Sequence, residues 1–335
     1  MLQHLLHFVS TIAQATHAWS DKASRSSLAP PQQTPQHEAT AAQLLSAAIG
    51  STMSWCGAAA EPLLTAGALR CLHALASCAL PLRLDTQPQA LLEVTLVAMA
   101  GAHVAAAAAG GVAALSPCDS SEAGPASAGA SHIGNAALMV QAYGLAFLGQ
   151  ACKQGWLQGN PVPSGLLPAV HSAVGMVASF LEQHQAAGRN LTIVACPAGG
   201  DALSPCCALA HACPGTHWRM STADLAAAAS AAAALLLWCG GPAGVNSVDA
   251  SGSGVLHRLS AAGCGQVLVA YMAAAGPHLE LTLRDARGAD AATVARCVCR
   301  TRPVSYGIAR MAQLVWFGCA RSHPTHFVVP TRCRD

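Results

Sequence analysis

The feature that most constrains the fold of this chain is the spacing of its apolar residues, which recur three and four positions apart over long segments. That spacing places apolar side chains on one face of an α-helix. Alanine supplies 74 of the 335 residues, whereas aromatic residues make up only 4%. Because strand-forming residues are too sparse for many half-buried strands, the composition argues against an all-β fold. The sequence therefore predicts an all-α protein.

The helical patterns follow one another along most of the chain, and Gly, Pro and polar residues separate them. Short breaks of this kind join antiparallel helices that pack as hairpins. A single hairpin cannot bury its apolar face, so hairpins of this kind stack on one another. We therefore expect a helical-hairpin repeat array, an α-solenoid. The expected helices are 38–60, 62–80, 89–115, 136–157, 164–185, 205–212, 222–239, 254–275, 289–300 and 306–320.

The expected organisation has six parts, whose boundaries fall at stretches rich in Gly, Pro and Ser. Such stretches are typical of loops and linkers. The parts are an N-terminal amphipathic helix (1–19), a linker (20–37), a helical segment (38–115), a flexible loop (116–135), the helical repeats (136–300), and a C-terminal helix with a basic tail (301–335).

One segment, residues 245–263, carries a specific repeat pattern. It reads VNSVDASGSGVLHRLSAAG, with Asn246, Asp249 and Gly252 three residues apart and a Leu-His pair, ending at His257, where a helix would start. This pattern resembles the opening of an ankyrin repeat, in which Asn, Asp and Gly precede a Thr-Pro-Leu-His helix start. In this chain Gly-Val stands where the family has Thr-Pro.

A second, partial copy of the pattern follows. Asp285 and Gly288 repeat the Asp-x-x-Gly spacing 36 residues later, whereas the family's repeat length is 33. The resemblance is clearest over 245–288 and weaker over 163–300. An armadillo- or HEAT-like array is the alternative, and the choice between these architectures for residues 38–160 is left open.

The residues of the pattern have physical roles of their own. Asp249 and Asn246 are expected to close a tight turn through hydrogen bonds from side chain to backbone, and Gly252 to take a positive φ. Leu256 is expected to be buried, and His257 to bind backbone groups at the helix start, which is a structural role.

The resemblance implies a non-catalytic scaffold or interaction module that binds another protein, of unknown identity, through its concave face and hairpin tips. Arg258 is expected at an exposed, variable position, and Arg296 and Arg300 are spaced to share one helix face. These three arginines are the candidate partner-binding residues. Nine arginines lie between residues 284 and 334, and the local charge over residues 284–335 is +6.

No motif for catalysis, for a metal or for a cofactor was recognised. The densest metal-like cluster has adjacent or widely spaced cysteines, which does not match structural zinc spacing. Nucleophile-elbow and phosphate-binding signatures are absent from the sequence. We expect no catalytic residue, no metal and no cofactor, and an enzyme without a recognisable motif is an alternative. The cluster consists of Cys206, Cys207, His211, Cys213 and His217.

The mean hydropathy of +0.40 raises the question of a membrane. The two most apolar segments, 94–115 and 225–239, owe their length to alanine and glycine, which contribute little insertion energy. Membrane association is therefore not expected, although a multi-span protein is an alternative.

The net charge of +2 gives no pull toward nucleic acid. Fifteen thinly spread cysteines and a poor signal peptide at 1–19 predict an intracellular location, cytoplasmic or nuclear, with an organelle left open.

Overall fold

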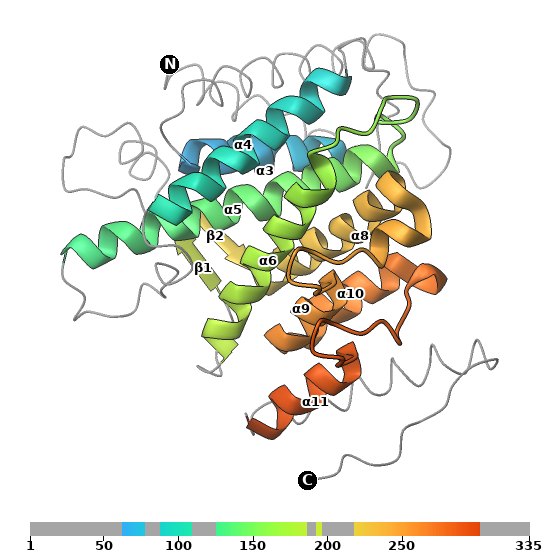
Figure 1. Cartoon of the computed structure of the whole chain (residues 1–335). Helices are drawn as coiled ribbons and strands as arrows, with labels where there is room; N and C mark the ends of the chain where they lie inside the picture. Colours follow the sequence, from blue (N-terminus) through green and yellow to red (C-terminus); the bar gives the residue numbers. More distant parts are fainter. Residues whose placement is uncertain (1–61, 78–87, 109–124, 186–191, 196–217, 302–335) are drawn as a thin grey trace, which may run out of the picture.

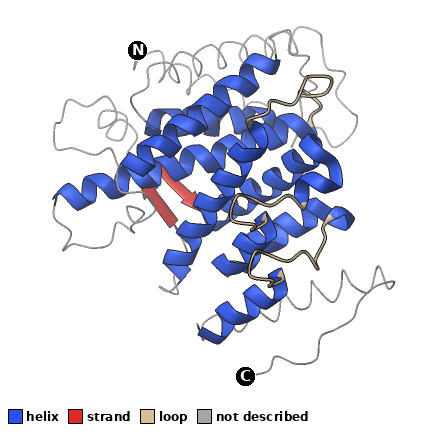
Figure 2. Cartoon of the chain, viewed as in Figure 1, coloured by secondary structure: helices blue, strands red, loops and turns tan. Residues whose placement is uncertain are grey.

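The structure is a computed structural model that describes residues 62–77, 88–108, 125–185, 192–195 and 218–301. This part of the chain is mostly helical, with one pair of short strands (Figure 2). The expectation of an all-α chain is confirmed for it. The elements are α3 (Pro62–Ser77), α4 (Pro88–Ala108), α5 (Pro125–Lys153), α6 (Leu166–Gln185), β1 (Thr192–Ala195), β2 (Trp218–Ser221), α8 (Thr222–Val245), α9 (Val255–Ala262), α10 (Gly265–Ala275), the 3-10 helix η2 (Gly276–His278) and α11 (Ala291–Thr301).

The helices pack in two rows that lie against each other (Figure 1). In one row α3 packs on α5, α5 on α8, and α8 on α10. In the other row α4 packs on α6, α6 on α9, and α9 on α11. Contacts of α5 with α4 and α6, of α8 with α6, and of α10 with α9 join the rows. Most of the helices therefore bury their apolar sides against neighbours in both rows.

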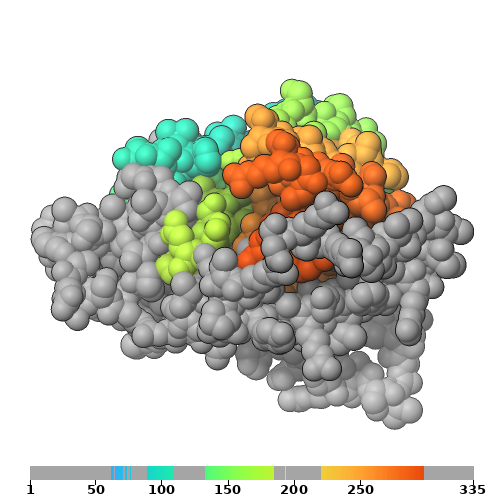
Figure 3. Space-filling model, turned by 60° about the horizontal axis from the view of Figure 1, so that its bottom comes forward, coloured from blue at the N-terminus to red at the C-terminus, as the bar shows by residue number. Residues whose placement is uncertain are grey.

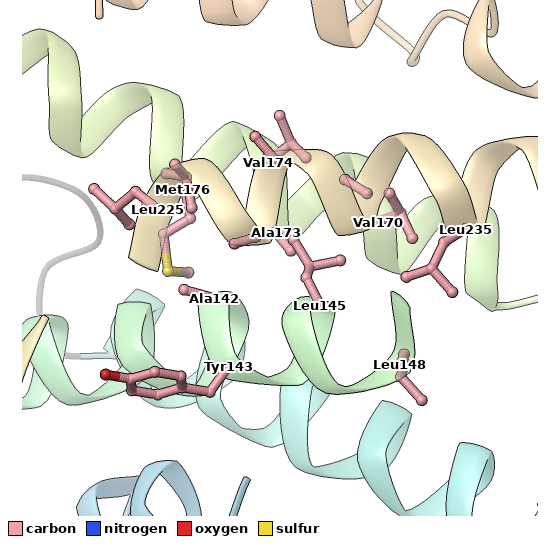
Figure 4. Close-up of a cluster of buried hydrophobic side chains, with 14 of the residues drawn as sticks. Ala142, Tyr143, Leu145, Leu148, Val170, Ala173, Val174, Met176, Leu225 and Leu235 are labelled. Carbon is pink, nitrogen blue, oxygen red and sulfur yellow. The ribbon is translucent and has the colours of Figure 1, made fainter. Parts of the chain in front are cut away.

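The core lies where α5, α6 and α8 meet (Figure 4). Leu145, Val170 and Leu235 come from these three helices and are all fully buried. The many alanines of α8 allow this helix to approach α5 closely. The approach is so close that a Cβ added at Gly149 of α5 would overlap with Ala231 of α8. Burial of each large aliphatic side chain contributes about 1.5–3 kcal/mol. Alanine-rich segments therefore serve here as closely packed core helices.

The start of α8 is fixed by its own sequence. Ser221, the last residue of β2, forms a capping box with Asp224, because each side chain bonds to the backbone N–H of the other residue, at 3.3 and 2.7 Å. The predicted helix over 222–239 begins as expected but continues to Val245 through a kink. Gly241 has a φ of 57° there and precedes Pro242.

Two boundaries differ from the prediction. Residues 125–135 were expected in a flexible loop, but they form the first turns of α5. Pro125 stands at the helix start, where its missing N–H is harmless, so this proline begins the helix and does not interrupt it. The apolar pattern over 254–275 is divided into α9 and α10, because Gly263 takes a left-handed φ of 72° and ends α9.

The paired strands were not predicted. β1 and β2 are antiparallel, with Thr192 opposite Ser221 and Ala195 opposite Trp218. They are short, and among their described side chains Ile193 and Met220 are buried in the core. Four-residue strands give little alternation to detect.

Several expectations lie outside the described residues, namely the amphipathic helix at 1–19, the linker and the helices at 38–60, 205–212 and 306–320.

Two described helices are long and apolar enough to cross a membrane, over Gln89–Ala108 and Thr222–Val245. The second is α8, whose apolar surface packs on α5 and α10.

Candidate functional site

The candidate site is built from two loops of the same form, the first turn (residues 248–254) and the second turn (residues 284–290). In the first turn the N–H of Asp249 donates to the carbonyl of Ser253 at 3.1 Å, and the N–H of Gly252 donates to the carbonyl of Asp249 at 2.9 Å. Oδ1 of Asp249 accepts from the N–H of Ser251 at 2.7 Å and of Ser253 at 3.2 Å. Gly252 has a φ of 72°. The Asp side chain thus closes the turn from within, as an Asx turn does.

The second turn repeats these bonds 36 residues later. Asp285 donates its N–H to the carbonyl of Ala289, and Gly288 donates its N–H to the carbonyl of Asp285, both at 2.9 Å. Oδ1 of Asp285 accepts from the N–H of Arg287 and of Ala289, also at 2.9 Å. Gly288 has a φ of 76°. Asp249 and Asp285 therefore occupy the same position in two turns of one design.

The two turns lie side by side (Figure 2). A Cβ added at Gly252 would lie 2.9 Å from the Cβ of Ala286, so the backbone of the first turn touches the second. His257 joins them from below, and it is 3% exposed. Its Nδ1 accepts from the N–H of Gly254 at 3.3 Å, so Nε2 carries the proton and donates to the carbonyl of Leu283 at 3.0 Å. Both ring nitrogens of this buried histidine are used.

Asn246 acts differently from the expectation that it closes the first turn. Its Nδ2 donates to the carbonyls of Pro242 and His278, and its Oδ1 accepts from the N–H of Glu280, all at 2.8 Å. The side chain therefore joins the end of α8 to the loop after α10. The three-residue spacing predicted that Asn246 acts beside Asp249. Its side-chain amide instead binds the neighbouring loop, which also offers backbone donors and acceptors.

Arg258 does not stand at an exposed position as expected. Its side chain is 34% exposed, and Nε donates to Oδ2 of Asp249 at 2.7 Å, while Nη2 contacts the same oxygen. Its Nη1 lies over α6, 2.8 Å from where a Cβ on Gly175 would be. Partial burial would raise the pKa of Asp249, but hydrogen bonds from Ser251, Arg258 and Ser253 more than offset that effect and lower it to about 2. Arg258 thus stabilises the first turn.

A further contact that the sequence did not predict joins α6 to the first turn. Ser247 donates its hydroxyl to the carbonyl of Gly244 at 2.6 Å, so its Oγ accepts from Nε2 of His171 at 2.8 Å. Ser247 precedes Asp249 by two residues, as Leu283 precedes Asp285. His171 and His257 are therefore placed alike, each bound to the chain just before the next turn. The short segment around His171 contains an Ala-Val-His run, which was the only sequence signal.

His171 is 8% exposed, and its Nδ1 has no partner within the described residues. Burial lowers the pKa of His171. Smaller effects come from Asp249, which raises this pKa, and from Arg258, which lowers it. The Ser247 hydroxyl gives its proton to Gly244 and not to His171, so the histidine does not activate this hydroxyl as a base. The pair therefore acts as a structural contact.

The outer ends of the turns are exposed and form two tips. The first tip consists of Val248, Ala250 and Ser251, and the second of Arg284, Ala286 and Arg287. Arg296, on α11, is exposed and donates to the carbonyl of Ala292 and the hydroxyl of Thr293 in its own helix. The side chain of Arg300 is outside the described residues, so its predicted pairing with Arg296 is untested.

The cluster of Cys206, Cys207, His211, Cys213 and His217 also lies outside the described residues. Within the described ranges, no three His, Cys, Asp or Glu side chains come together as metal ligands would. Cys152, Cys239 and Cys264 are thiols. Burial raises the pKa of the Cys239 thiol to about 11, with a smaller effect of Cys152, so Cys239 is protonated at neutral pH.

Comparison with protein-family models, with curated proteins and with solved structures found no match for this chain.

Proposed function

We propose that this protein is a non-catalytic interaction module made of stacked helical hairpins, which binds another protein through the two tips and the adjoining helix row. The observation that carries this proposal is the pair of turns. They share every backbone hydrogen bond, lie 36 residues apart, and touch through Gly252 and Ala286. Turns of identical form at a fixed interval are typical of repeat proteins.

The helix rows support the stacked arrangement. The row of α3, α5, α8 and α10 runs beside the row of α4, α6, α9 and α11, and each helix packs mainly on its neighbours. Contacts of this nearest-neighbour kind are what a helical repeat array requires. His171 binds the chain just before the first turn, as His257 binds the chain just before the second turn. This buried histidine contact is therefore a further feature that the two turns share.

The chemistry of the described residues supports a binding role over a catalytic one. The aspartates of both turns accept backbone N–H groups, His257 binds backbone groups, and His171 binds Ser247. Polar groups that are committed to structure in this way are not poised for proton transfer. The resemblance to ankyrin repeats remains the reason to place the partner at the tips, and that inference is an analogy between folds.

Site-specific photo-crosslinking tests this proposal. A photoreactive amino acid replaces Val248 at the first tip in one variant and Val104 on α4 in the other. Both valines are exposed, Val248 by 47% and Val104 by 67%, so a partner could reach either one. They lie on different parts of the surface, the first tip and α4. In an extract of the source cells, the Val248 variant should crosslink to a discrete protein, and excess wild-type chain should suppress the product. If position 248 gives no product, or the same products as position 104, the tips are not the interaction surface.

A further inference from the structure

The two tips carry different side chains at equivalent positions. Counted from the Asp of each turn, Val248 corresponds to Arg284, and Ser251 corresponds to Arg287. All four side chains are exposed. The same backbone therefore presents an uncharged tip in the first turn and two guanidinium groups in the second.

The positive charge of the second tip is directed outward. Neither Arg284 nor Arg287 is paired with a carboxylate within the described part of the chain. The neighbouring carboxylates are bound to backbone groups, because Asp285 accepts two N–H groups of its own turn and Asp290 accepts the N–H of Thr293 at 2.7 Å, at the start of α11. In the first turn, by contrast, the charge of Arg258 is matched by Asp249. The second tip therefore presents two unmatched cations to solvent within three residues of each other, Arg284 and Arg287.

The tips also adjoin, since Gly252 and Ala286 are in contact. The part of the chain around the second turn lies on the surface (Figure 3, orange), and α11, which follows this turn, packs on α9. An extended chain crossing both tips would meet Val248 and Ser251 first and the two arginines next. Planar guanidinium groups bind carboxylates through paired hydrogen bonds, and an exposed valine offers an apolar contact.

We propose that the tips bind an extended segment of another protein in which an apolar residue is followed by acidic residues. This inference rests on the proposed function and adds the chemistry of the partner. Arg284 and Arg287 bind the carboxylates, and Val248 contacts the apolar side chain. A nucleic acid is the less favoured occupant, because the whole chain has a net charge of only +2 and the first tip is uncharged.

The test uses the full chain and a short labelled peptide in which one valine precedes a run of glutamates. Fluorescence anisotropy should show binding that weakens as salt is raised from about 0.05 M to about 0.5 M. Arg284→Glu and Arg287→Glu should each weaken binding about tenfold, because each replaces attraction by repulsion. Lys153→Glu is the matched control, since Lys153 is exposed at the end of α5 and the change in net charge is the same. It should change affinity less than about twofold.

Several results would overturn this inference. Absence of binding, equal loss in the Lys153→Glu control, or equal binding of the same peptide with glutamine for glutamate would each do so. Tighter binding of a labelled single-stranded RNA, with the same dependence on Arg284 and Arg287, would assign the tips to nucleic acid instead. If the acidic peptide fails while the photo-crosslink at Val248 still captures a discrete protein, the interaction module stands and only the acidic partner is wrong.

Discussion

The first and second turns share one backbone but differ in what surrounds them. The first turn is enclosed, because Arg258 binds its Asp249, His171 reaches Ser247 beneath it, and Ala286 covers Gly252. At the second turn, a Cβ on Gly288 would meet nothing within 4 Å of the described residues, and the side chains at its tip are arginines in solvent. Identical local hydrogen bonds thus occur in a mainly structural turn and in a turn that faces outward. The difference lies in the neighbours and in the side chains at the tips, and not in the hydrogen bonds within each turn.

The helix below the first turn should show the largest effect. Leu256 of α9 is 3% exposed, and the residue at the same position in α11 is Ala292. Leu256→Ala gives α9 the residue that α11 has at this position and removes a buried side chain, which costs about 2–5 kcal/mol. We expect the loss in urea unfolding, with Val248→Ala as an exposed control within about 0.5 kcal/mol. Unchanged unfolding of Leu256→Ala would mean that α9 is not held as described.

The two glycines give a direct comparison of enclosure. Both have a positive φ, so alanine at either position adds strain of about 1 kcal/mol. Gly252→Ala must also displace Ala286, which lies 2.9 Å from the new Cβ, and that overpacking adds about 1–3 kcal/mol. Thermal unfolding should therefore show a larger loss for Gly252→Ala than for Gly288→Ala. Equal losses would show that the turns do not touch in solution.

Asp249 and Asp285 make the same turn hydrogen bonds, but Asp249 also forms an ion pair with Arg258. Comparing variants of the two aspartates therefore separates the stability due to the turn bonds from that due to the ion pair. The pKa of Asp249 is about 2 in the folded chain, below the usual 3.8, so its charged form stabilises the fold. That contribution is complete above about pH 4 and is lost as the pH falls through about 2. Asp249→Asn should therefore cost about 2 kcal/mol at pH 7. The difference from wild type should shrink between pH 4 and pH 2.5.

Asp285→Asn is the matched variant, because Asp285 closes its turn without an arginine partner among the described residues. It should cost less than Asp249→Asn at pH 7 in the same denaturant series. If the two variants lose equal stability at pH 7, the Arg258 ion pair contributes nothing to the first turn. A loss in Asp249→Asn that does not depend on pH would mean that the hydrogen bonds from Ser251, Arg258 and Ser253 do not hold the carboxylate charged.

The sequence predicted the helices and the two turns because both depend on local features. Apolar residues at helical spacing are sufficient for α6 and α8, and Asp and Gly three residues apart define each turn. Contacts between distant segments were not predictable. The bond from His171 to Ser247 and the packing of Arg258 over Gly175 join residues more than 70 positions apart. Neither spacing nor composition reports which helix lies beside which, and that arrangement decides that Arg258 is half-buried.

The smallest effect in the comparison concerns the arginines themselves. Arg258→Ala should cost about 0.5–1 kcal/mol, because a half-exposed ion pair is partly screened by water. Arg284→Ala, at the second tip, should stay within about 0.5 kcal/mol, since its side chain has no partner among the described residues. A double-mutant cycle of Asp249→Asn and Arg258→Ala isolates the pair and should give a coupling that decreases as the pH falls through about 2, where the carboxylate takes up a proton. A coupling of zero at pH 7 would mean that Arg258 is free in solution, and the first turn would then be as open as the second.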